Sequence, residues 1–381
     1  MRNAVKSVDM TLGQKLWQIN WTMVLLICAI TGVGLAMLYS AASGSLWPWA
    51  GPQALRFAVG LALMFTVALC DLRFWYRYAY AAYGFALTLL LAVEIAGDIG
   101  MGAQRWLDLG LFRLQPSELM KVALVLALAR YFHGLTHDEV VRPRHVLLPL
   151  LLAAMPVGLV LRQPDLGTAV MLLSGTLAIL FVAGVRLWKF IALGTAALAA
   201  LPVMWAAMHD YQRQRVLTFL DPERDPLGAG YHILQSKIAL GSGGLFGRGY
   251  MQGTQSHLNF LPEKQTDFIF TMLAEEFGLA GGLALIALFA LLLVYGYAIA
   301  LRARNTFGRL TAMGVTTTFF LYVFVNIAMV MGVIPVVGVP LPLVSYGGTA
   351  LLTVLVCFGL LMNVYIHRDV RFGRHGTESG G

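Results

Sequence analysis

The longest apolar stretch, residues 268–300, reads FIFTMLAEEFGLAGGLALIALFALLLVYGYAIA, and its only charged side chains are Glu275 and Glu276. A helix needs about 20 apolar residues to cross the roughly 30 Å hydrocarbon core of a bilayer. The stretch is therefore long enough to span a membrane, and it predicts a transmembrane helix.

The composition of the chain extends this prediction to all 381 residues. Hydrophobic residues make up 59% of the chain and charged residues 12%, whereas soluble domains carry about 25% charged residues. The mean hydropathy is +0.73. These values indicate an integral membrane protein and exclude a disordered chain, a secreted disulfide scaffold and a cytosolic enzyme. Cys28, Cys70 and Cys357 lie inside apolar runs without metal-ligand spacing, so we expect them to pack as small hydrophobic side chains.

Nine further apolar runs qualify as spans, at residues 22–40, 54–70, 78–96, 116–132, 146–161, 166–185, 190–208, 310–334 and 349–366. The sequence thus predicts an all-α integral membrane protein with ten transmembrane helices. A large extracytoplasmic loop, residues 209–266, would separate helices 7 and 8. We expect one transmembrane domain over residues 1–372 and a polar, disordered tail over residues 373–381.

The basic residues predict the orientation of the ten spans. With the amino terminus in the cytoplasm, every connection on that side contains lysine or arginine, whereas the connections 41–53 and 335–348 on the other side contain none. This positive-inside pattern favours an even number of spans with both termini cytoplasmic. The net charge of +8 is therefore a topology signal, and no nucleic-acid partner follows from it.

Two external segments have their own structure signals. Residues 97–115 contain RWLD at 105–108, which suits a short helix at the membrane interface. In the large loop, an apolar stripe at helical spacing predicts an amphipathic surface helix; its members are Tyr231, Ile233, Leu234, Ile238 and Leu240. Residues 241–249 hold five glycines, follow no strand and contain no Walker lysine, so we expect a flexible turn.

Ionisable residues at or inside spans mark functional sites, because lipid makes them costly. Glu118 and Lys121 are three residues apart at the start of the fourth span, so they share a helix face and can pair. An intrahelical salt bridge and a catalytic role both stay open, and either places the pair in a polar cavity. Asp165 lies in the tight corner RQPDLGT, residues 162–168, where a role as the cap of the sixth helix is slightly favoured.

Asp267 is the last charged residue before the long apolar run that follows the loop. It can cap that helix, or it can act as a general base. Burial would raise its pKa, while the amino terminus of a helix would lower it. A carboxylate that is ionised but poorly hydrated suits proton abstraction. Glu275 lies eight residues further on the same expected face, and Glu275 and Glu276 would support the site.

The connection at residues 335–348 reads PVVGVPLPLVSYGG, which is apolar but breaks helices. Irregular backbone at membrane depth is tolerated where it is buried or lines a cavity. Asn326 in the preceding span is positioned to satisfy some of its backbone groups, and Ser345 adds a hydroxyl. The chain lacks HExxH, a Cys/His cluster and a serine elbow, so neither a metalloprotease nor an acyl transferase is indicated.

Basic residues gather on the predicted outer side; they are Arg105, Arg113, Lys121, Arg162, Arg213, Arg215, Lys237, Arg248 and Lys264. Guanidinium and ammonium groups bind pyrophosphate well. An outward cavity with several cations and a few acids suits an anionic amphiphile such as a phosphate-linked lipid. These residues are compatible both with transport of such a lipid and with a chemical reaction on it.

Several motifs of this sequence resemble the SEDS family (shape, elongation, division and sporulation). They are GTQSHLNFLPEKQTDFIF (253–270), AEEFG (274–278), PLPLVSYGG (340–348) with Asn326, QPDLGT (163–168), and QPSE (115–118) continuing to Lys121. The matches cover nearly the whole chain in order. The GTQS stretch, Lys264-Gln265 and the short termini resemble the elongation member more than the division member.

The resemblance implies an inverting peptidoglycan glycosyltransferase that polymerises lipid II into β-1,4 glycan strands, releases undecaprenyl pyrophosphate and maintains rod shape. It implies Asp267 as the general base, Arg213, Arg215 and Lys237 as pyrophosphate ligands, and a cavity shaped by Glu118 and Lys121. Arg105, Asp165, Glu263 and Ser345 complete the expected site.

The resemblance also implies a multi-pass protein of the bacterial cytoplasmic membrane. Its expected partners are a class B penicillin-binding protein and other membrane proteins of the elongation complex. A divalent cation, Mg²⁺ or Mn²⁺, is expected to assist the leaving group at an unknown site. The alternatives are a lipid II flippase, to which ten spans and membrane-embedded acids also fit, and the division member of the family.

Overall fold

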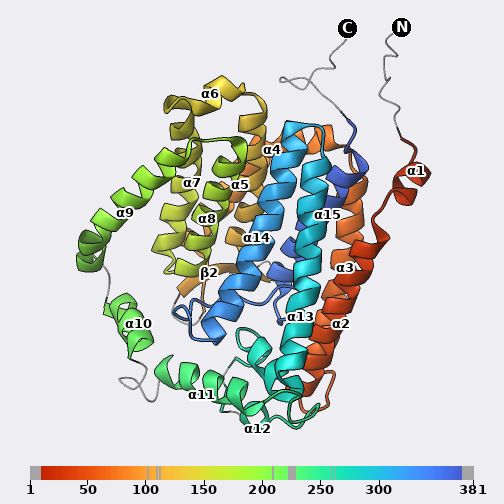
Figure 1. Cartoon of the computed structure of the whole chain (residues 1–381), viewed down its shortest axis with the longest axis vertical. Coiled ribbons are helices and arrows are strands. Elements are labelled where there is room, and N and C mark those ends of the chain that lie inside the picture. Colours follow the sequence, from red (N-terminus) through yellow and green to blue (C-terminus); the bar gives the residue numbers. More distant parts are fainter. Residues whose placement is uncertain are drawn as a thin grey trace.

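The computed structural model describes residues 10–100, 103–108, 110, 113–207, 210–221, 229–258, 260–261 and 263–370. Long helices run beside one another, with α14 (Thr306–Val330) and α15 (Gly348–Ile366) in the middle of the bundle (Figure 1). The short helices α1 (Leu12–Trp17) and α6 (His137–Val141) lie at one end of the bundle. The opposite end carries α10 (Asp210–Leu220), α11 (Ala229–Ser242) and α12 (Thr254–His257).

Eight helices in the described part of the chain are long and apolar enough to cross a membrane. They are α2 (Trp21–Ala41), α3 (Ala50–Leu69), α4 (Leu72–Ala96), α7 (Arg144–Arg162), α8 (Leu166–Ala183), α13 (Ile269–Arg302), α14 and α15. Each coincides with a predicted span to within a few residues at most of its ends, which confirms a helical, multi-spanning fold.

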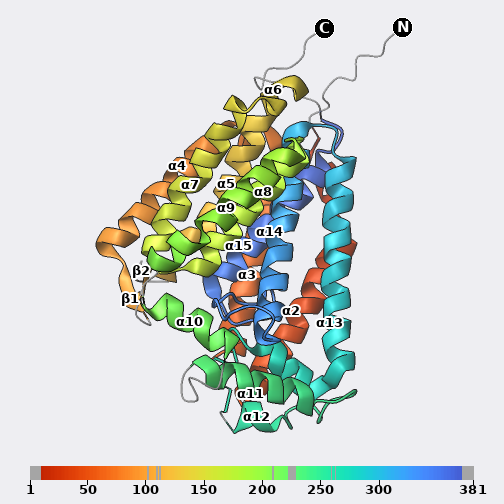
Figure 2. The same ribbon diagram turned by 60° about the vertical axis from the view of Figure 1, so that its left-hand side comes forward.

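The two remaining predicted spans are also helical, but their composition or described length differs. α5 (Pro116–His133) carries Glu118, Lys121 and Arg130 within 18 residues, and most of its side chains are buried by other helices. α9 (Leu187–Ala207) lies on the outside of the bundle, at the left in Figure 1 and in front of the other helices in Figure 2. Its apolar stretch Leu187–Pro202 is shorter than the eight helices above. The count of ten therefore stays a prediction.

The bundle is organised around α14, which packs against α5, α8, α13 and α15. Three phenylalanines form an aromatic column through this centre. The ring of Phe319 lies 5.9 Å from that of Phe289 in α13 and 5.0 Å from that of Phe358 in α15, both edge-on. Edge-to-face pairs of this kind add about 0.5–1.5 kcal/mol each beyond area burial, so they help to fix the three helices in register.

The residues Arg105–Asp108, for which the sequence predicts a short interfacial helix, lie in a β-strand, so that prediction is wrong. β1 (Asp98–Gly100), β2 (Ala103–Asp108) and β3 (Arg113–Leu114) form a small antiparallel sheet in the order β1-β2-β3. Ile99 pairs with Gln104, and Leu107 pairs with Leu114. Tight connections between short segments favour antiparallel pairing over a helix, because adjacent strands satisfy each other's backbone groups.

The large loop contains a helix over the predicted apolar stripe, α11. Ile233 and Ala239 are buried, whereas Leu234 and Ile238 are exposed. The buried hydroxyl of Ser236 donates a hydrogen bond to the Val330 carbonyl at the end of α14 (2.7 Å). The buried face of α11 is therefore narrower than the stripe. Residues 373–381 lie outside the described residues, and the predicted domain bounds stay predictions.

Candidate functional site

Residues 335–347, which join α14 to α15, fold back into the bundle as irregular chain. Buried polar side chains, two of them from other elements, pair with several of this segment's backbone groups, as burial at membrane depth requires. The Asn326 amide donates to the Val339 carbonyl (2.8 Å), and the Gln53 amide donates to the Ser345 carbonyl (2.9 Å). The Leu341 amide donates to the Ser345 hydroxyl (2.8 Å). This segment confirms the predicted role of Asn326, while Gln53 was not singled out from the sequence.

The same segment holds the turn that precedes α13. The Ser345 hydroxyl donates to the Thr266 carbonyl, and the Tyr346 amide donates to the Gln265 carbonyl (2.8 Å). Asn326 also donates to the main-chain carbonyl of Asp267 (2.9 Å). Thus Asn326 and Ser345 each contact both segments, and they position the turn at residues 263–268 without using the Asp267 carboxylate.

The Asp267 carboxylate is half-buried, and among the residues that the structure describes none donates a hydrogen bond to it. α13 begins at Ile269 with Phe268 as its N-cap, and Phe268 makes no side-chain cap bond. Asp267 therefore does not cap the helix, and the capping interpretation is not supported. Burial raises the pKa of this carboxyl to about 6, and the negative charge of Glu263 adds to the rise. Such a group can accept a proton near neutral pH.

Space beside the Asp267 carboxylate is kept by Gly338. This residue has a φ of +71°, and a Cβ there would lie 3.6 Å from Oδ2 of Asp267. Glycine adopts this conformation at little cost, whereas other residues are strained in it. The backbone of the 335–347 segment therefore approaches the carboxylate without placing a side chain over it.

Glu263 shapes the turn that carries Asp267. Its backbone has a φ of +50°, and its carboxylate accepts hydrogen bonds from the Thr266 hydroxyl (3.0 Å) and the Gln265 amide (3.3 Å). The neighbouring Lys264 ammonium donates to the Ser256 carbonyl (2.8 Å), and burial lowers the pKa of Lys264. Glu263 thus acts on Asp267 both by holding its turn and by its charge.

Glu118 and Lys121 pair as the sequence suggested, and Tyr322 joins them. The Lys121 ammonium lies 2.8 Å from Glu118 Oε1, and the Tyr322 hydroxyl contacts both Lys121 and Glu118 Oε2. All three side chains are at most 4% exposed. Tyr322 was not predicted from the sequence. Its position one helical turn before Asn326, within an apolar span, could have marked it as a buried polar partner.

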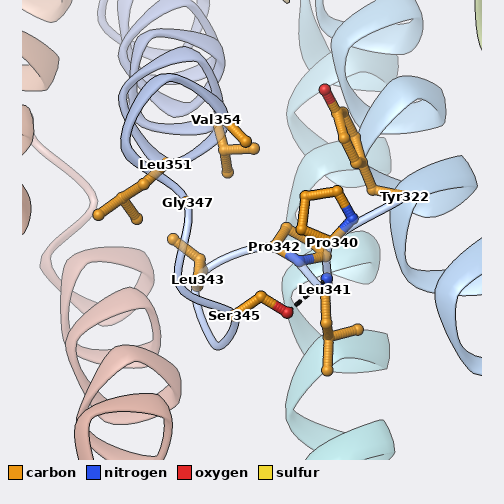
Figure 3. A pocket seen from close by; sticks show the side chains of 10 residues that line it. Tyr322, Pro340, Leu341, Pro342, Leu343, Ser345, Gly347, Leu351 and Val354 are labelled. Carbon is orange, nitrogen blue, oxygen red and sulfur yellow. Dashed lines mark hydrogen bonds between the residues drawn. The ribbon is translucent and has the colours of Figure 1, made fainter. Parts of the chain in front are cut away.

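A small pocket lies where Tyr322 of this cluster meets the irregular segment. Its lining includes Tyr322 from α14, Pro340, Pro342 and Ser345 from the 335–347 segment, and Leu351 from α15 (Figure 3). Pro340 lies next to Tyr322, whose hydroxyl points away from Ser345 (Figure 3). The buried cluster and the Asp267 turn therefore contact opposite parts of one segment.

The corner between α7 and α8 brings Asp165 and Arg105 to the same region. Asp165 is the N-cap of α8 and accepts hydrogen bonds from the Thr168 amide (3.1 Å) and hydroxyl (2.9 Å), which confirms the capping interpretation. The Arg105 guanidinium donates to the carbonyls of Gln163 (3.1 Å) and Pro164. Both residues hold the corner, and α8 in turn packs its Gly167 against Val337 of the irregular segment.

The described contacts of Arg213 and Lys237, two of the predicted pyrophosphate ligands, are with residues other than Asp267. The Arg213 guanidinium donates to the carbonyls of Trp205 (3.0 Å) and Ala206 (2.7 Å) near the end of α9. Lys237 is exposed, and its side chain lies against Gly332. A Cβ added to Gly332 would lie 2.4 Å from Cε of Lys237. Arg215 belongs to α10, but its side chain lies outside the described residues.

Glu275 and Glu276 are fully buried, and their carboxylates bind α12 and α2 through hydrogen bonds. Glu275 accepts hydrogen bonds from the amides of Gln255 (2.7 Å) and Ser256 (3.2 Å) at the start of α12. Glu276 accepts hydrogen bonds from Ser40 in α2 and from His257 (3.3 Å). The expectation that Asp267 and Glu275 share a helix face is wrong, because Asp267 precedes the helix.

No group of three or more His, Cys, Asp or Glu side chains that could hold a metal ion occurs among the residues with described positions. Mg²⁺ in proteins is commonly bound by one or two carboxylates together with substrate phosphates. The described His, Cys, Asp and Glu side chains thus do not form a complete cation site by themselves.

Replacing Asn326 by leucine is expected to destabilise the protein by about 1–3 kcal/mol, the usual cost of leaving buried polar groups unpaired, and to lower the turnover rate. The substitution frees two carbonyls and releases the Asp267 turn from α14. Thermal unfolding in detergent and a turnover assay would measure the two effects.

Asn363→Leu is a matched control. Asn363 is equally buried, but its amide donates to carbonyls at the end of α3, including those of Ala68 (3.1 Å) and Cys70 (2.6 Å). We expect a comparable loss of stability with turnover retained in the folded fraction. Equal losses of turnover in both variants would contradict a positioning role for Asn326.

Comparisons with known proteins agree over almost the whole chain. The family model for FtsW, RodA and SpoVE, described as "Cell cycle protein", matches residues 19–370. The peptidoglycan glycosyltransferase MrdB of Escherichia coli strain K12 is 48% identical over 353 residues, covering 92% of this chain and 94% of MrdB.

Solved structures show the same fold. A chain from a structure described as "Structural coordination of polymerization and crosslinking by a peptidoglycan synthase complex" is 35% identical, with a TM-score of 0.81 over 93% of this chain and 99% of that chain. The rod shape determining protein RodA of Thermus thermophilus is 31% identical, with a TM-score of 0.70 over 93% and 98% of the two chains. The family match, residues 19–370, spans all the site residues from Gln53 to Tyr346.

Proposed function

Because this chain belongs to the FtsW, RodA and SpoVE family of cell cycle proteins, we propose that Asp267 is the general base of its glycosyl transfer reaction. The chain is a multi-pass membrane protein and a RodA-like peptidoglycan glycosyltransferase. The elongation type predicted from the sequence is thus confirmed. The observation that carries the proposal is a half-buried carboxylate whose turn is held by neighbouring segments while its oxygens accept no described hydrogen bond.

The substrate we propose is lipid II, a disaccharide linked to undecaprenyl pyrophosphate. The 4-hydroxyl of an acceptor GlcNAc attacks the anomeric carbon of a donor MurNAc, and Asp267 takes the hydroxyl proton. The bond from the anomeric carbon to the pyrophosphate oxygen breaks, undecaprenyl pyrophosphate leaves, and inversion produces a β-1,4 linkage. A positioned base of this kind commonly contributes about 10²–10⁴-fold to the rate.

The leaving pyrophosphate needs cationic partners, and we propose Arg213, Arg215 and Lys237 for this role. Guanidinium groups bind phosphate oxygens in a bidentate manner. Arg213 donates to α9 carbonyls in this structure, so binding pyrophosphate would require its side chain to change partners. A divalent cation, Mg²⁺ or Mn²⁺, remains part of the proposal as a companion of the pyrophosphate oxygens.

We further propose a bacterial cytoplasmic-membrane location with both termini in the cytoplasm. The class of partner is a class B penicillin-binding protein that cross-links the new glycan, alongside other membrane proteins of the elongation complex. The matched peptidoglycan synthase complex, whose description joins polymerisation to cross-linking, supports this pairing.

The proposed reaction is tested by supplying lipid II in detergent to the purified chain with its transpeptidase partner. We expect glycan strands that lengthen with time. Movement of lipid II across vesicles without any polymer would instead support the flippase that the sequence left open, and would exclude the proposed chemistry.

The pH dependence of the reaction follows from the raised pKa of Asp267. A general base must be ionised, so kcat/KM should increase as the pH rises through about 6 and level off above that value. Below this pH the carboxyl is protonated and cannot take the hydroxyl proton. A pH–rate profile between mildly acidic and mildly alkaline buffers would measure the midpoint.

Glu263→Gln tests the assignment of that midpoint. The negative charge of Glu263 raises the pKa of Asp267, so its removal should move the midpoint to lower pH, while the glutamine can still accept hydrogen bonds within the turn. Asp138→Asn, in α6 at the opposite end of the bundle, removes one charge without contacting the site and should leave the midpoint unchanged. A shift to higher pH in Glu263→Gln would contradict the assignment.

A further inference from the structure

The glycine-rich stretch at residues 241–249 has no role in the reaction above, but it makes close contact with α13. Four main-chain hydrogen bonds of 2.9–3.0 Å join them: Arg248 to the Glu275 carbonyl, Gly249 to that of Glu276, Leu279 to that of Gly244, and Ala280 to that of Leu245. They form where α13 is interrupted at Gly278, which has φ 68° and ψ −164°. The stretch thus replaces backbone bonds that the break removes, and it is more than the turn expected from the sequence.

Glycine is required where the two backbones meet. A Cβ at Gly278 would lie 2.4 Å from the Gly247 nitrogen, and a Cβ at Gly247 would lie 2.1 Å from the Glu276 carbonyl oxygen. Both residues also have positive φ, which strains any other side chain. The stretch is therefore fixed relative to α13.

The tip of this stretch presents large apolar side chains outward. Phe246 is 82% exposed and Leu245 is 65% exposed. On α13 just beyond the break, Leu279 and Leu283 are each 54% exposed, as expected of a helix face that meets lipid. Since Leu245 accepts a hydrogen bond from Ala280, the tip adjoins the part of α13 that carries these leucines.

The length of α13 indicates how deep the tip lies relative to the membrane. Residues 279–300 are apolar and extend about 33 Å at about 1.5 Å per residue, which matches a hydrocarbon core of about 30 Å. Arg302, the last residue of α13, lies beyond the other end of this stretch. Gly278 therefore falls at the boundary between hydrocarbon and headgroups. Arg248, exposed and two residues after Phe246, is within reach of lipid phosphates at that boundary.

We propose that Leu245 and Phe246 insert into the lipid leaflet at the α11 end of the bundle and anchor the large loop to the membrane. The occupant of this apolar surface is lipid, because the surface adjoins the outward-facing leucines of α13 and lies at the boundary between hydrocarbon and headgroups. Apolar side chains beside a basic residue are typical of interfacial membrane attachment.

The anchor is connected to the Asp267 turn by a chain of hydrogen bonds. The stretch binds the Glu275 carbonyl, the Glu275 carboxylate holds Ser256, and the Ser256 carbonyl accepts from Lys264. Lys264 lies in the turn that carries Asp267. Insertion of the tip thus sets the height of that turn relative to the membrane surface.

Depth-dependent fluorescence quenching tests the anchor. Phe246→Cys, made in a chain whose three cysteines are replaced by alanine, is labelled with an environment-sensitive dye and placed in phosphatidylethanolamine and phosphatidylglycerol nanodiscs without any other protein. Leu283→Cys on α13 provides a lipid reference, and Arg142→Cys in the connection after α6 provides a water reference. We expect blue-shifted emission at position 246, with stronger quenching by a nitroxide near the headgroup than by one at the chain end.

Emission at position 246 like that of the water reference, without nitroxide quenching, would overturn the proposal and leave the surface to a protein partner. The coupling to the Asp267 turn is tested separately in lipid. Phe246→Asp should slow polymerisation several-fold, whereas Phe246→Trp, whose indole suits the interface, should retain it. An unchanged rate in Phe246→Asp would remove the coupling even if the tip is inserted.

Discussion

Asp267→Asn is expected to slow lipid II polymerisation by about 10²–10⁴-fold, the usual contribution of a general base. Asparagine keeps the shape of the side chain but cannot take the hydroxyl proton. The main-chain carbonyl of residue 267 keeps its hydrogen bond to Asn326, and no described donor to the carboxylate is lost. The folded structure should therefore persist, and glycan formation from lipid II measures the loss.

Asp369→Asn is the control for this substitution. It is the same chemical change at the exposed opposite end of the bundle, where Asp369 pairs with Arg304 at 3.1 Å on the surface, and we expect the wild-type rate. Thermal unfolding and co-purification with the partner would show whether both variants are folded. A folded Asp267→Asn protein that polymerises at the wild-type rate would refute the assigned role.

The largest effect on stability is expected from Lys121→Met. Removing one partner of a buried ion pair leaves an uncompensated charge and commonly costs about 3–5 kcal/mol. Glu118, 4% exposed, would keep only the Tyr322 hydroxyl as a described hydrogen-bond donor. Unfolding of the purified chain in mixed detergent micelles would measure the free energy.

The triple substitution Glu118→Leu, Lys121→Met and Tyr322→Phe separates charge burial from packing. It replaces all three polar groups with apolar ones of similar volume, and such replacements are often nearly neutral. We therefore expect the triple variant to be more stable than Lys121→Met alone, although it lacks the polar groups of all three side chains. A single variant as stable as wild type would show that the Glu118 carboxylate is not desolvated.

Several elements of the site could be predicted from the sequence because their signals are local. Glu118 and Lys121 are three residues apart on one helix, so their pairing follows from helix geometry alone. Asp165 precedes α8 in a tight corner, and it caps that helix. Asp267 is singled out by its place between a long loop and an apolar run, even though its predicted alternative as a cap is not supported.

Other elements depend on contacts between distant parts of the chain. Tyr322 meets Glu118 across 204 residues, and Gln53 meets Ser345 across 292 residues. Arg105, expected in the substrate cavity, donates hydrogen bonds to the carbonyls of Gln163 and Pro164 in the α7–α8 corner. No periodicity or spacing reports such partners, since hydrogen bonds are completed in three dimensions.

The membrane fold, most helix positions and the acid that precedes α13 follow from the order of the amino acids, because apolar length and the cost of charge in lipid act along the chain. The inward fold of residues 335–347, which holds the Asp267 turn, and the break of α13 at Gly278 follow from contacts between distant segments. Backbone groups buried away from water must find partners. Which partners they find depends on how the helices pack.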